Sequence, residues 1–509
     1  MPDIVRRKRR SLHLGLRFAL WIGFNLVVFG LSLLLRDSGG SQPLQTEKRA
    51  RSTRDVTSPP KILNCTKVET RNAINSYPKD LFTADQRRKG AVLLHVLAVL
   101  YLFLATAIVC EDYFMPAIYV CTARFQLDPS VVGAVIVGSF CSAPELATTI
   151  IGVFVSGNDV GVGAMVGTAV TNYVLIVGLC CILKPAGKTV IVQPWTVTRD
   201  TVWGAIGMVV FLVVVMDGKA TWDESVIMCI VYMLYVFSLC FNRTLENMFR
   251  RVVPDPRPED KPCCCLYTCC CGRHDDAQAS DDTKSLVKAD PFQDLPEEEE
   301  EEPPKSIWSV PERWDRRAWW CICLPIYLPL YLTIPDCRRE RWHDWFALAL
   351  LMCMLYIIGY CYVIIWMSTI TGNTLGMSDD LMGLTTLGVG TSLPDIVNAV
   401  VATNDGEGDM AIATAIGAMS FCMLFCVGFP WFLRSATTQF RPVAVKTEGL
   451  EHCAVATTVL VAIVFVMLCF SRFHLRRTVG VVCGFLFLGF LAFAVYIDQV
   501  VLNQNCVKT

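Results

Sequence analysis

Two carboxylates stand beside prolines inside long apolar runs of this chain. The first is Glu145 in the sequence Ser142-Ala-Pro-Glu, and the second is Asp395 in Ser392-Leu-Pro-Asp. A proline has no N–H for the helix ladder, so it releases backbone carbonyls nearby. An ionised acid at the bilayer centre costs about 2.5–3.5 kcal/mol even on a lenient insertion scale. A cation held between the acids would offset that cost, and oxygen ligands of these kinds favour calcium, sodium or potassium.

The two motifs belong to a longer repeat with a constant offset of 250 residues (145 to 395). The offset matches Ser142 with Ser392, Pro144 with Pro394, Glu145 with Asp395, Gly138 with Gly388, Asp159 with Asp409, and Gly167 with Gly417. Each copy predicts two helices with a tight connection. Five helices separate the copies, so the copies start from opposite sides of the membrane. Inverted repeats with broken helices near the midplane are typical of secondary transporters. The alternative is that the prolines are simple kinks and neighbouring Ser or Thr residues satisfy the acids.

The elements that must hold these motifs are membrane helices. The chain has 509 residues, of which 53% are hydrophobic, and a span needs about 20 apolar residues. Runs of this kind lie near 14–35, 90–110, 131–155, 160–183, 201–216, 223–241, 343–369, 381–403, 410–433, 452–471 and 479–501. We therefore predict an all-α multi-pass membrane protein: ten transmembrane helices in two inverted five-helix repeats, plus an N-terminal hydrophobic segment.

Charge placement predicts the domain organisation. Residues 1–35 read as a signal peptide or, preferably, a signal anchor, because basic residues precede a long apolar stretch. Residues 36–89 form an extracellular segment with a glycosylation sequon at Asn64. The first repeat is 90–241, the second is 343–509, and 242–342 is a cytosolic loop whose acidic composition indicates disorder. Within it, the short, proline-broken run 321–335 reads as interfacial or re-entrant.

Basic residues agree with this orientation three times, because the following residues all fall on the predicted cytosolic side: Lys184, Lys188 and Arg199; Arg243, Arg250 and Arg251; and Arg472, Arg476 and Arg477. The net charge of -1 gives no sign of a nucleic-acid partner. The six histidines are scattered without a nucleophile–base constellation, so an enzyme is not expected.

Cysteines and secondary polar residues leave alternatives open. The six cysteines of 263–271 favour palmitoylation over a zinc site, since only His274 is near. Cys65 and Cys506 both fall on the predicted outside and could pair. Asp159 and Asp409 read better as helix N-caps than as ion ligands. Thr148 and Asn398, one turn beyond the acids, are open candidates for the ion path.

The repeats resemble the alpha repeats of the cation/calcium exchanger superfamily, and within it the potassium-dependent sodium/calcium exchangers. The resemblance lies in SAPEL with GVGAMVGTAVTN and in GTSLPD with GEGDMAIATAIG, and it extends to 109–118, 324–336 and 440–445. It implies alternating-access exchange of external sodium against calcium plus potassium, with no cofactor. By this resemblance Glu145 and Asp395 match the central carboxylates. Their matching oxygen and amide ligands are Ser142, Thr391, Ser392 and Asn172.

The chain departs from that family pattern in both repeats. Cys422 stands where the family has an acid linked to potassium binding, and Met419 stands where it has an asparagine. Phe140 and Cys141 replace small residues before the first motif. We therefore expect a plasma-membrane antiporter that exchanges sodium for calcium, with potassium transport in question. The alternative is a non-transporting, regulatory relative that keeps the fold.

Overall fold

The computed structural model describes residues 76–124, 142–157, 160–184, 192–252, 313–405, 408–445 and 449–508. Its main elements, in chain order, are α3 (Ala84–Gln86), η2 (Arg87–Ala91), α4 (Val92–Val109), η3 (Cys110–Phe114), α5 (Met115–Arg124), α8 (Ala143–Ile151), η5 (Gly152–Ser156), α9 (Val160–Val170), η6 (Thr171–Ile176), α10 (Val177–Leu183), α11 (Pro194–Val215), β1 (Lys219–Ala220), α12 (Trp222–Cys240), α13 (Asn242–Val252), α14 (Trp314–Thr333), η7 (Glu340–Trp345), α15 (Phe346–Leu375), α16 (Asp379–Met382), η8 (Gly383–Leu387), α17 (Gly388–Thr391), α18 (Leu393–Asp405), α19 (Gly408–Ser420), η9 (Phe421–Phe425), α20 (Cys426–Thr437), β2 (Val443–Ala444), α21 (Leu450–Phe470) and α22 (Arg477–Lys508).

Most of these elements form spans long and apolar enough to cross a bilayer. The described part of the chain contains eight such spans, and nine when the bent pair Asp379–Thr391 and Leu393–Asn404 counts as one. The predicted run 131–155 is represented by the shorter apolar helix Ala143–Ser156. The rest of that run, the predicted segment 1–35 and the cysteine cluster lie outside the described residues. The prediction of an all-helical, multi-pass protein is confirmed.

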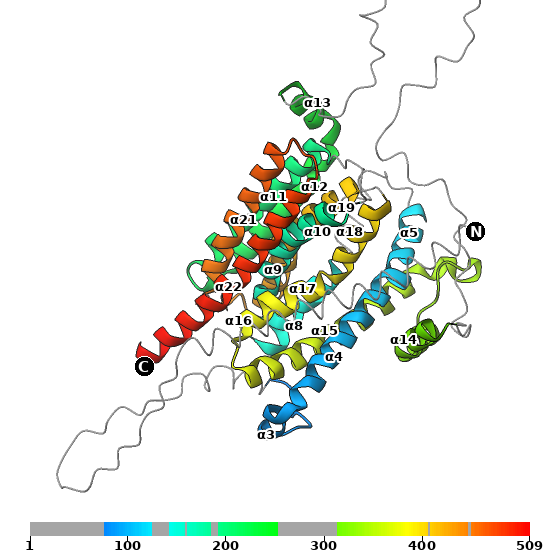
Figure 1. Cartoon of the computed structure of the whole chain (residues 1–509), viewed down its shortest axis with the longest axis vertical. Coiled ribbons are helices and arrows are strands. Elements are labelled where there is room, and N and C mark those ends of the chain that lie inside the picture. Colours follow the sequence, from blue (N-terminus) through cyan, green and yellow to red (C-terminus); the bar gives the residue numbers. More distant parts are fainter. Residues whose placement is uncertain are drawn as a thin grey trace, which may run out of the picture.

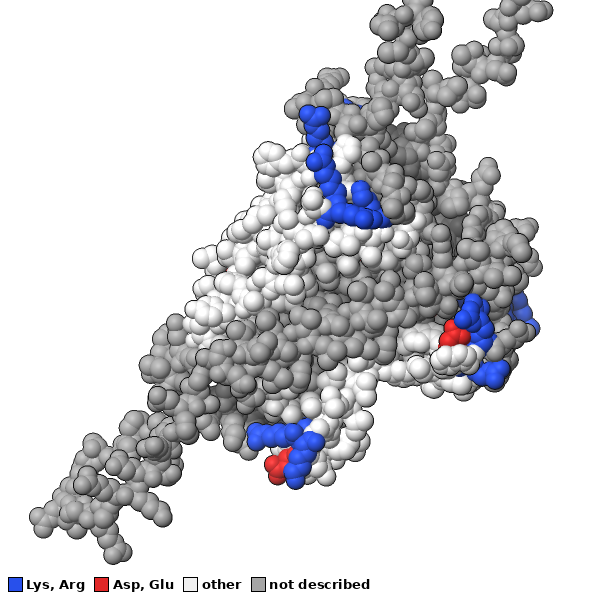
Figure 2. All heavy atoms as spheres, in the orientation of Figure 1, with Lys and Arg blue, Asp and Glu red and all other residues white. Residues whose placement is uncertain are grey.

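The helices carry apolar side chains on their outer surface as well as in their core. Val213, Phe237 and Phe485 are among many large exposed hydrophobic residues. Figure 2 shows that, on the face it presents, the charges of the described residues gather near α13, near α3 and beside α14. An apolar outer band with charged ends is the surface expected of helices that contact lipid.

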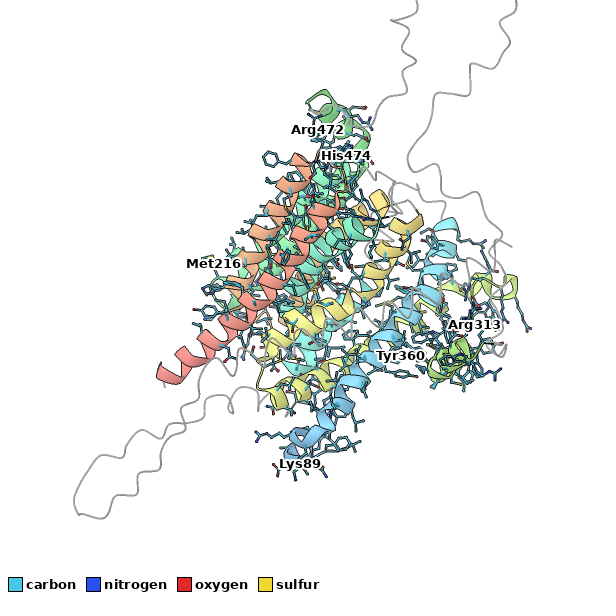
Figure 3. The ribbon with its side chains drawn as sticks, in the orientation of Figure 1. Lys89, Met216, Arg313, Tyr360, Arg472 and His474 are labelled. Carbon is cyan, nitrogen blue, oxygen red and sulfur yellow. The ribbon has the colours of Figure 1, made fainter. Side chains whose placement is uncertain are left out.

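Two sets of backbone contacts define the two ends of the helix bundle. At one end β1 pairs antiparallel with β2, with Ala220 opposite Val443; we call this the sheet end. At the other end the N–H of Val192 donates to the carbonyl of Phe473 at 2.9 Å, and we call this the α13 end. Figure 3 places Arg472 and His474 near α13, and Met216, just before β1, away from them.

The two repeats run in opposite directions between these ends. The turn after η5 lies at the sheet end, because Gly157 and Val443 line one pocket there. The turn between α18 and α19 lies toward α13 (Figure 1). The equivalent helix pairs are therefore antiparallel in space, which confirms the inverted repeat.

Glycines allow the two repeats to cross at very close range. A Cβ on Gly167 of α9 would lie 2.1 Å from the carbonyl oxygen of Leu384, and one on Gly388 would lie 2.7 Å from the Cα of Gly167. Helices can approach this closely only where side chains are absent. The crossing brings α9 of the first repeat against η8 and α17 of the second, and η6 against α18, which carries Asp395.

Helix α14 contains the run that reads as interfacial or re-entrant. It continues through Pro325 and Pro329 and is not among the candidate spans of the described chain. The hydroxyl of Tyr327 donates to Asp112 Oδ2 at 2.6 Å, and that of Tyr101 donates to the carbonyl of Ile322 at 3.1 Å. These bonds hold α14 against the first span, and its depth in the membrane stays a prediction.

Candidate cation site

In both motifs the helix that carries the proline begins directly after the serine. Ser142 has φ -88° and ψ 21°, and Ser392 has φ -79° and ψ 4°. The breaks leave Pro144 and Pro394 in the first turn of α8 and α18, where a proline removes no hydrogen bond of its own helix. The expectation that each proline interrupts a continuous helix is therefore corrected. In the second motif α17 ends at Thr391, the chain turns at Ser392, and α18 begins at Leu393.

The two acids are buried where the broken helices of the two repeats meet. Glu145 is 1% exposed and Asp395 is 9% exposed, and the two carboxylates are within electrostatic reach of each other. Neither carboxylate oxygen of Glu145 has a hydrogen-bond partner among the described residues. Unpaired buried acids are costly, so the pair forms a centre of negative charge that a cation would stabilise.

The two hydroxyl groups of the second motif donate their hydrogens to backbone carbonyls of the preceding turn. Thr391 donates to the carbonyl of Leu387 at 3.0 Å, and Ser392 donates to that of Gly388 at 2.9 Å. A hydroxyl that donates its hydrogen still has oxygen lone pairs. These oxygens can therefore serve as ligands for a cation, as the resemblance implies.

An amide from the first repeat reaches the acid of the second. Asn172 in η6 donates through Nδ2 to Asp395 Oδ2 at 3.4 Å, and its buried Oδ1 has no partner among the described residues. Its counterpart at the offset of 250 residues (172 to 422) is Cys422 in η9. The Cys422 thiol donates to Ser142 Oγ at 3.5 Å, so each repeat sends one such side chain toward the broken helix of the other.

The local backbone repeats as well. Asn172 lies in the π-helical turn Thr171–Ile176, and Cys422 lies in the π-helical turn Phe421–Phe425. Single π turns inside α-helices frequently mark functional sites. All six residues that the family resemblance nominates are buried, namely Glu145, Asp395, Ser142, Thr391, Ser392 and Asn172.

Two residues near the site were missed by the sequence analysis. Thr168 donates to the carbonyl of Gly388 at 3.2 Å and lies 3.4 Å from Thr391 Oγ1. Its position one turn before Asn172 in the same motif was an available signal. Phe103 of α4 covers Gly390 at the second break, where a Cβ would lie 2.0 Å from the ring. No sequence signal indicated Phe103, because it is one apolar residue among many in its helix.

The structure treats the secondary candidates for the ion path and for the helix N-caps differently. Thr148 is buried and donates to the carbonyl of Pro144 at 2.8 Å, whereas Asn398 is exposed and does not join the buried group. Asp409 lies inside the first turn of α19, which begins at Gly408, so it is not the N-cap that we expected. Asp159 and Cys65 lie outside the described residues, as does the side chain of Cys506.

The donor set consists mainly of hard oxygen atoms. Among the described residues, no three His, Cys, Asp or Glu side chains come together in a way that could hold a metal ion. The site combines two carboxylates with hydroxyl and amide oxygens, which suits calcium or alkali cations better than zinc. Fold and site together define a membrane carrier of the inverted-repeat class, with a candidate cation centre where the repeats meet.

Comparison with known proteins supplies the family. Residues 95–241 and 345–496 match the family model described as sodium/calcium exchanger protein. The chain is 30% identical to human sodium/potassium/calcium exchanger 5, over 98% of this chain and 97% of that protein. It is 28% identical to human sodium/potassium/calcium exchanger 4, over 86% and 85% of the two chains. The chain belongs to the sodium/calcium exchanger family, which is a family of transporters and not of enzymes.

A solved structure supports the architecture. The crystal structure of the H+/Ca2+ exchanger CAX aligns over 87% of this chain and 91% of that chain, with a TM-score of 0.50 and 10% sequence identity. At this identity the likeness concerns the fold alone.

Proposed function

We propose that the chain exchanges sodium for calcium at one site formed by Glu145 and Asp395, and that it does so without potassium. The observation that carries this proposal is the burial of two acids, one from each inverted repeat, within electrostatic reach of each other, with no hydrogen-bond partner for the oxygens of Glu145 among the described residues. Two carboxylates carry two negative charges. They balance one calcium ion or two sodium ions, so the same site can hold either cargo in turn.

The ligands that complete the site are the hydroxyls of Ser142, Thr391 and Ser392 and the amide oxygen of Asn172. The hydrogen bonds from Thr391 and Ser392 to backbone carbonyls aim the hydroxyl hydrogens away from a bound ion. Asn172 donates to Asp395 and keeps Oδ1 available. This donor set needs no resident cofactor, because the cations are the cargo.

Cys422 is the reason that the proposed transport cycle does not include potassium. It occupies the position equivalent to Asn172 and contacts Ser142, so it lies beside the first acid. A neutral thiol is a poor ligand for a hard monovalent cation. Calcium and potassium together carry three positive charges against two carboxylates, and an unbalanced buried charge is strongly destabilising.

We further propose that the sheet end is extracellular and that the protein works in the plasma membrane. The basic residues at the α13 end, including Arg472, support this orientation by the positive-inside rule. Ser76, which lies within the predicted outer segment 36–89, donates to the carbonyl of Ser156 at 3.5 Å, and so joins that segment to the turn at the sheet end.

The decisive experiment is calcium uptake into sodium-loaded cells that express this chain, with external potassium absent or present. Sodium-dependent uptake without potassium is the expected result. A strict potassium requirement would contradict the account of Cys422. If the protein reaches the surface and shows no exchange in either condition, the second candidate holds. That candidate is a non-transporting relative, and it is favoured by Cys422 and Met419, which replace polar ligands of the family pattern.

A further inference from the structure

A pocket at the sheet end lies apart from the cation site. It has a volume of about 320 Å³ and is lined by residues of both repeats: Gly152, Val153, Gly157, Gly161 and Val162 from the first, and Trp431, Arg434, Thr438, Arg441, Pro442, Val443 and Ala444 from the second. Its walls are η5 with Gly157, the start of α9, the end of α20, and β2. None of the residues proposed as cation ligands lines it.

The pocket carries positive charge that has no counter-ion among the described residues. Arg434 and Arg441 both line it, and no acidic side chain appears in the lining. Arg434 lies over the ring of Phe154 with its Cζ atom 5.7 Å from the ring centroid, so its guanidinium is held by an aromatic face. Two guanidinium groups at one pocket, with no acidic side chain among its described lining residues, favour an anion, since each presents a fork of donors that matches carboxylate and phosphate oxygens.

The loop that presents Arg441 is tightly built. Ser435 Oγ donates to the carbonyl of Arg441 at 3.0 Å, and the N–H of Phe440 donates to the carbonyl of Ser435 at 2.8 Å. Gln439 and Phe440 have φ values of 58° and 59°, a left-handed conformation that is costly for residues other than glycine. Backbone strain of this kind persists only where the surroundings enforce it, and here it aligns Arg441 with the pocket.

Two further contacts hold the loop in place. Pairing of β1 with β2 joins it to the connection between α11 and α12, and the ring of Phe440 packs edge-on against Trp222 with centroids 5.7 Å apart. The guanidinium of Arg441 is thus carried on a braced loop, and that of Arg434 on a helix. A loop that is already held in place loses less conformational entropy when an anion binds to it.

We propose that this pocket is an anion site that binds a phosphate-type oxyanion through Arg434 and Arg441. The apolar walls from Trp431, Pro442 and Val443 would accommodate an organic portion attached to the oxyanion. Free phosphate and the headgroup of a phospholipid share this chemistry, and the pocket opens at a membrane end where either is available. Because the walls come from both repeats, a bound anion joins the turn after η5 to α20 and stabilises the conformation in which they meet.

The test uses the purified full-length protein and does not depend on transport. Thermal unfolding is followed while inorganic phosphate is titrated at constant ionic strength, with gluconate as the control anion. We expect a saturable rise in the unfolding temperature for the wild type. The rise should be lost in Arg434→Gln and in Arg441→Gln and kept in Arg472→Gln, which removes a charge at the α13 end (Figure 3). Arg434→Lys keeps the charge without the fork, so it gives a weakened shift and replaces Arg434→Gln if that variant does not fold.

A second arm identifies the source of the oxyanion. The same titration is run with a short-chain phosphatidic acid and, as its control, a short-chain diacylglycerol without the phosphate. A shift that depends on both arginines and appears only with phosphatidic acid assigns the site to a lipid headgroup, and a shift with inorganic phosphate assigns it to a soluble anion. If neither probe gives a shift, or if the shift survives in both arginine variants, the proposal is wrong.

Discussion

Asn172 of the first repeat donates a hydrogen bond to Asp395 of the second at 3.4 Å. The two residues are 223 positions apart in the chain, and the contact forms because the repeats run antiparallel and cross at glycines. Its counterpart by the repeat offset joins Cys422 to Ser142 at 3.5 Å. The site therefore has an internal two-fold pattern in which only one of the two cross-repeat side chains is an amide.

Replacing Glu145 by glutamine is expected to abolish exchange. One carboxylate cannot balance a divalent ion in a buried site, and losing one partner of a buried charge pair costs about 3–5 kcal/mol, so calcium uptake should fall by about 100-fold or more. Surface expression should persist, because an amide is easier to bury than an unpaired acid. Uptake and surface labelling are measured together, with Glu145→Asp as the control that keeps the charge. Near-normal uptake by the glutamine variant would rule out the two-carboxylate site.

Replacing Cys422 by aspartate is expected to create a potassium requirement. The change adds a third negative charge beside Ser142 and Glu145, which would balance calcium and potassium together. Uptake is measured as potassium is titrated from zero, and Cys422→Asn is the control with the same shape and no charge. The asparagine variant should stay independent of potassium. If both variants acquire the same potassium dependence, charge at position 422 is not the cause.

The membrane orientation predicts which segments are accessible from outside the cell. A glycan should be found at Asn64, and an epitope tag inserted within 275–305 should be stained only after permeabilisation. The physical reason is that basic residues gather at the α13 end, which the positive-inside rule assigns to the cytosol. Surface staining of the loop tag on intact cells would reverse the assignment of the two ends.

A methyl group at Gly390 is expected to disturb the second break through Phe103. The added Cβ would lie 2.0 Å from the tip of the ring, and overpacking of this kind typically costs about 1–3 kcal/mol. Gly390→Ala should therefore lower the unfolding temperature, and adding Phe103→Leu should restore part of it. Gly359→Ala is the control, since a Cβ there meets nothing within 4 Å. Simple additivity of the two changes would show that the ring does not press on this glycine.

A methyl group at Gly167 is expected to be worse tolerated than one at Gly390. Its Cβ would lie 2.1 Å from the carbonyl oxygen of Leu384, and a backbone atom cannot rotate away as a side chain can. Gly167→Ala should therefore abolish folded protein or separate the repeats by enough to lose exchange. Gly489→Ala, with no neighbour within 4 Å of its Cβ, should fold normally. The yield of monodisperse protein measures both, and equal yields would contradict the close crossing.

The sequence by itself determined the membrane class, the offset of 250 residues between motifs and the identity of the two acids. Hydropathy and charge are properties of each residue type, so they can be read without knowing which residues come into contact. It also pointed to the inverted orientation, since the number of intervening spans can be counted from apolar runs. A carboxylate in an apolar run is informative whatever its neighbours, and so Glu145 and Asp395 could be chosen from the printed chain.

Only the tertiary structure decided where the helices break and which residues meet. Backbone geometry at Ser142 and Ser392 depends on the packing around each turn, and that packing moved the break away from the prolines. The contacts of Thr168 with Thr391, and of Phe103 with Gly390, join segments more than 200 residues apart, so no local pattern encodes them. The arginine pocket at the sheet end arises in the same way, because its walls come from both repeats and only antiparallel packing brings them together.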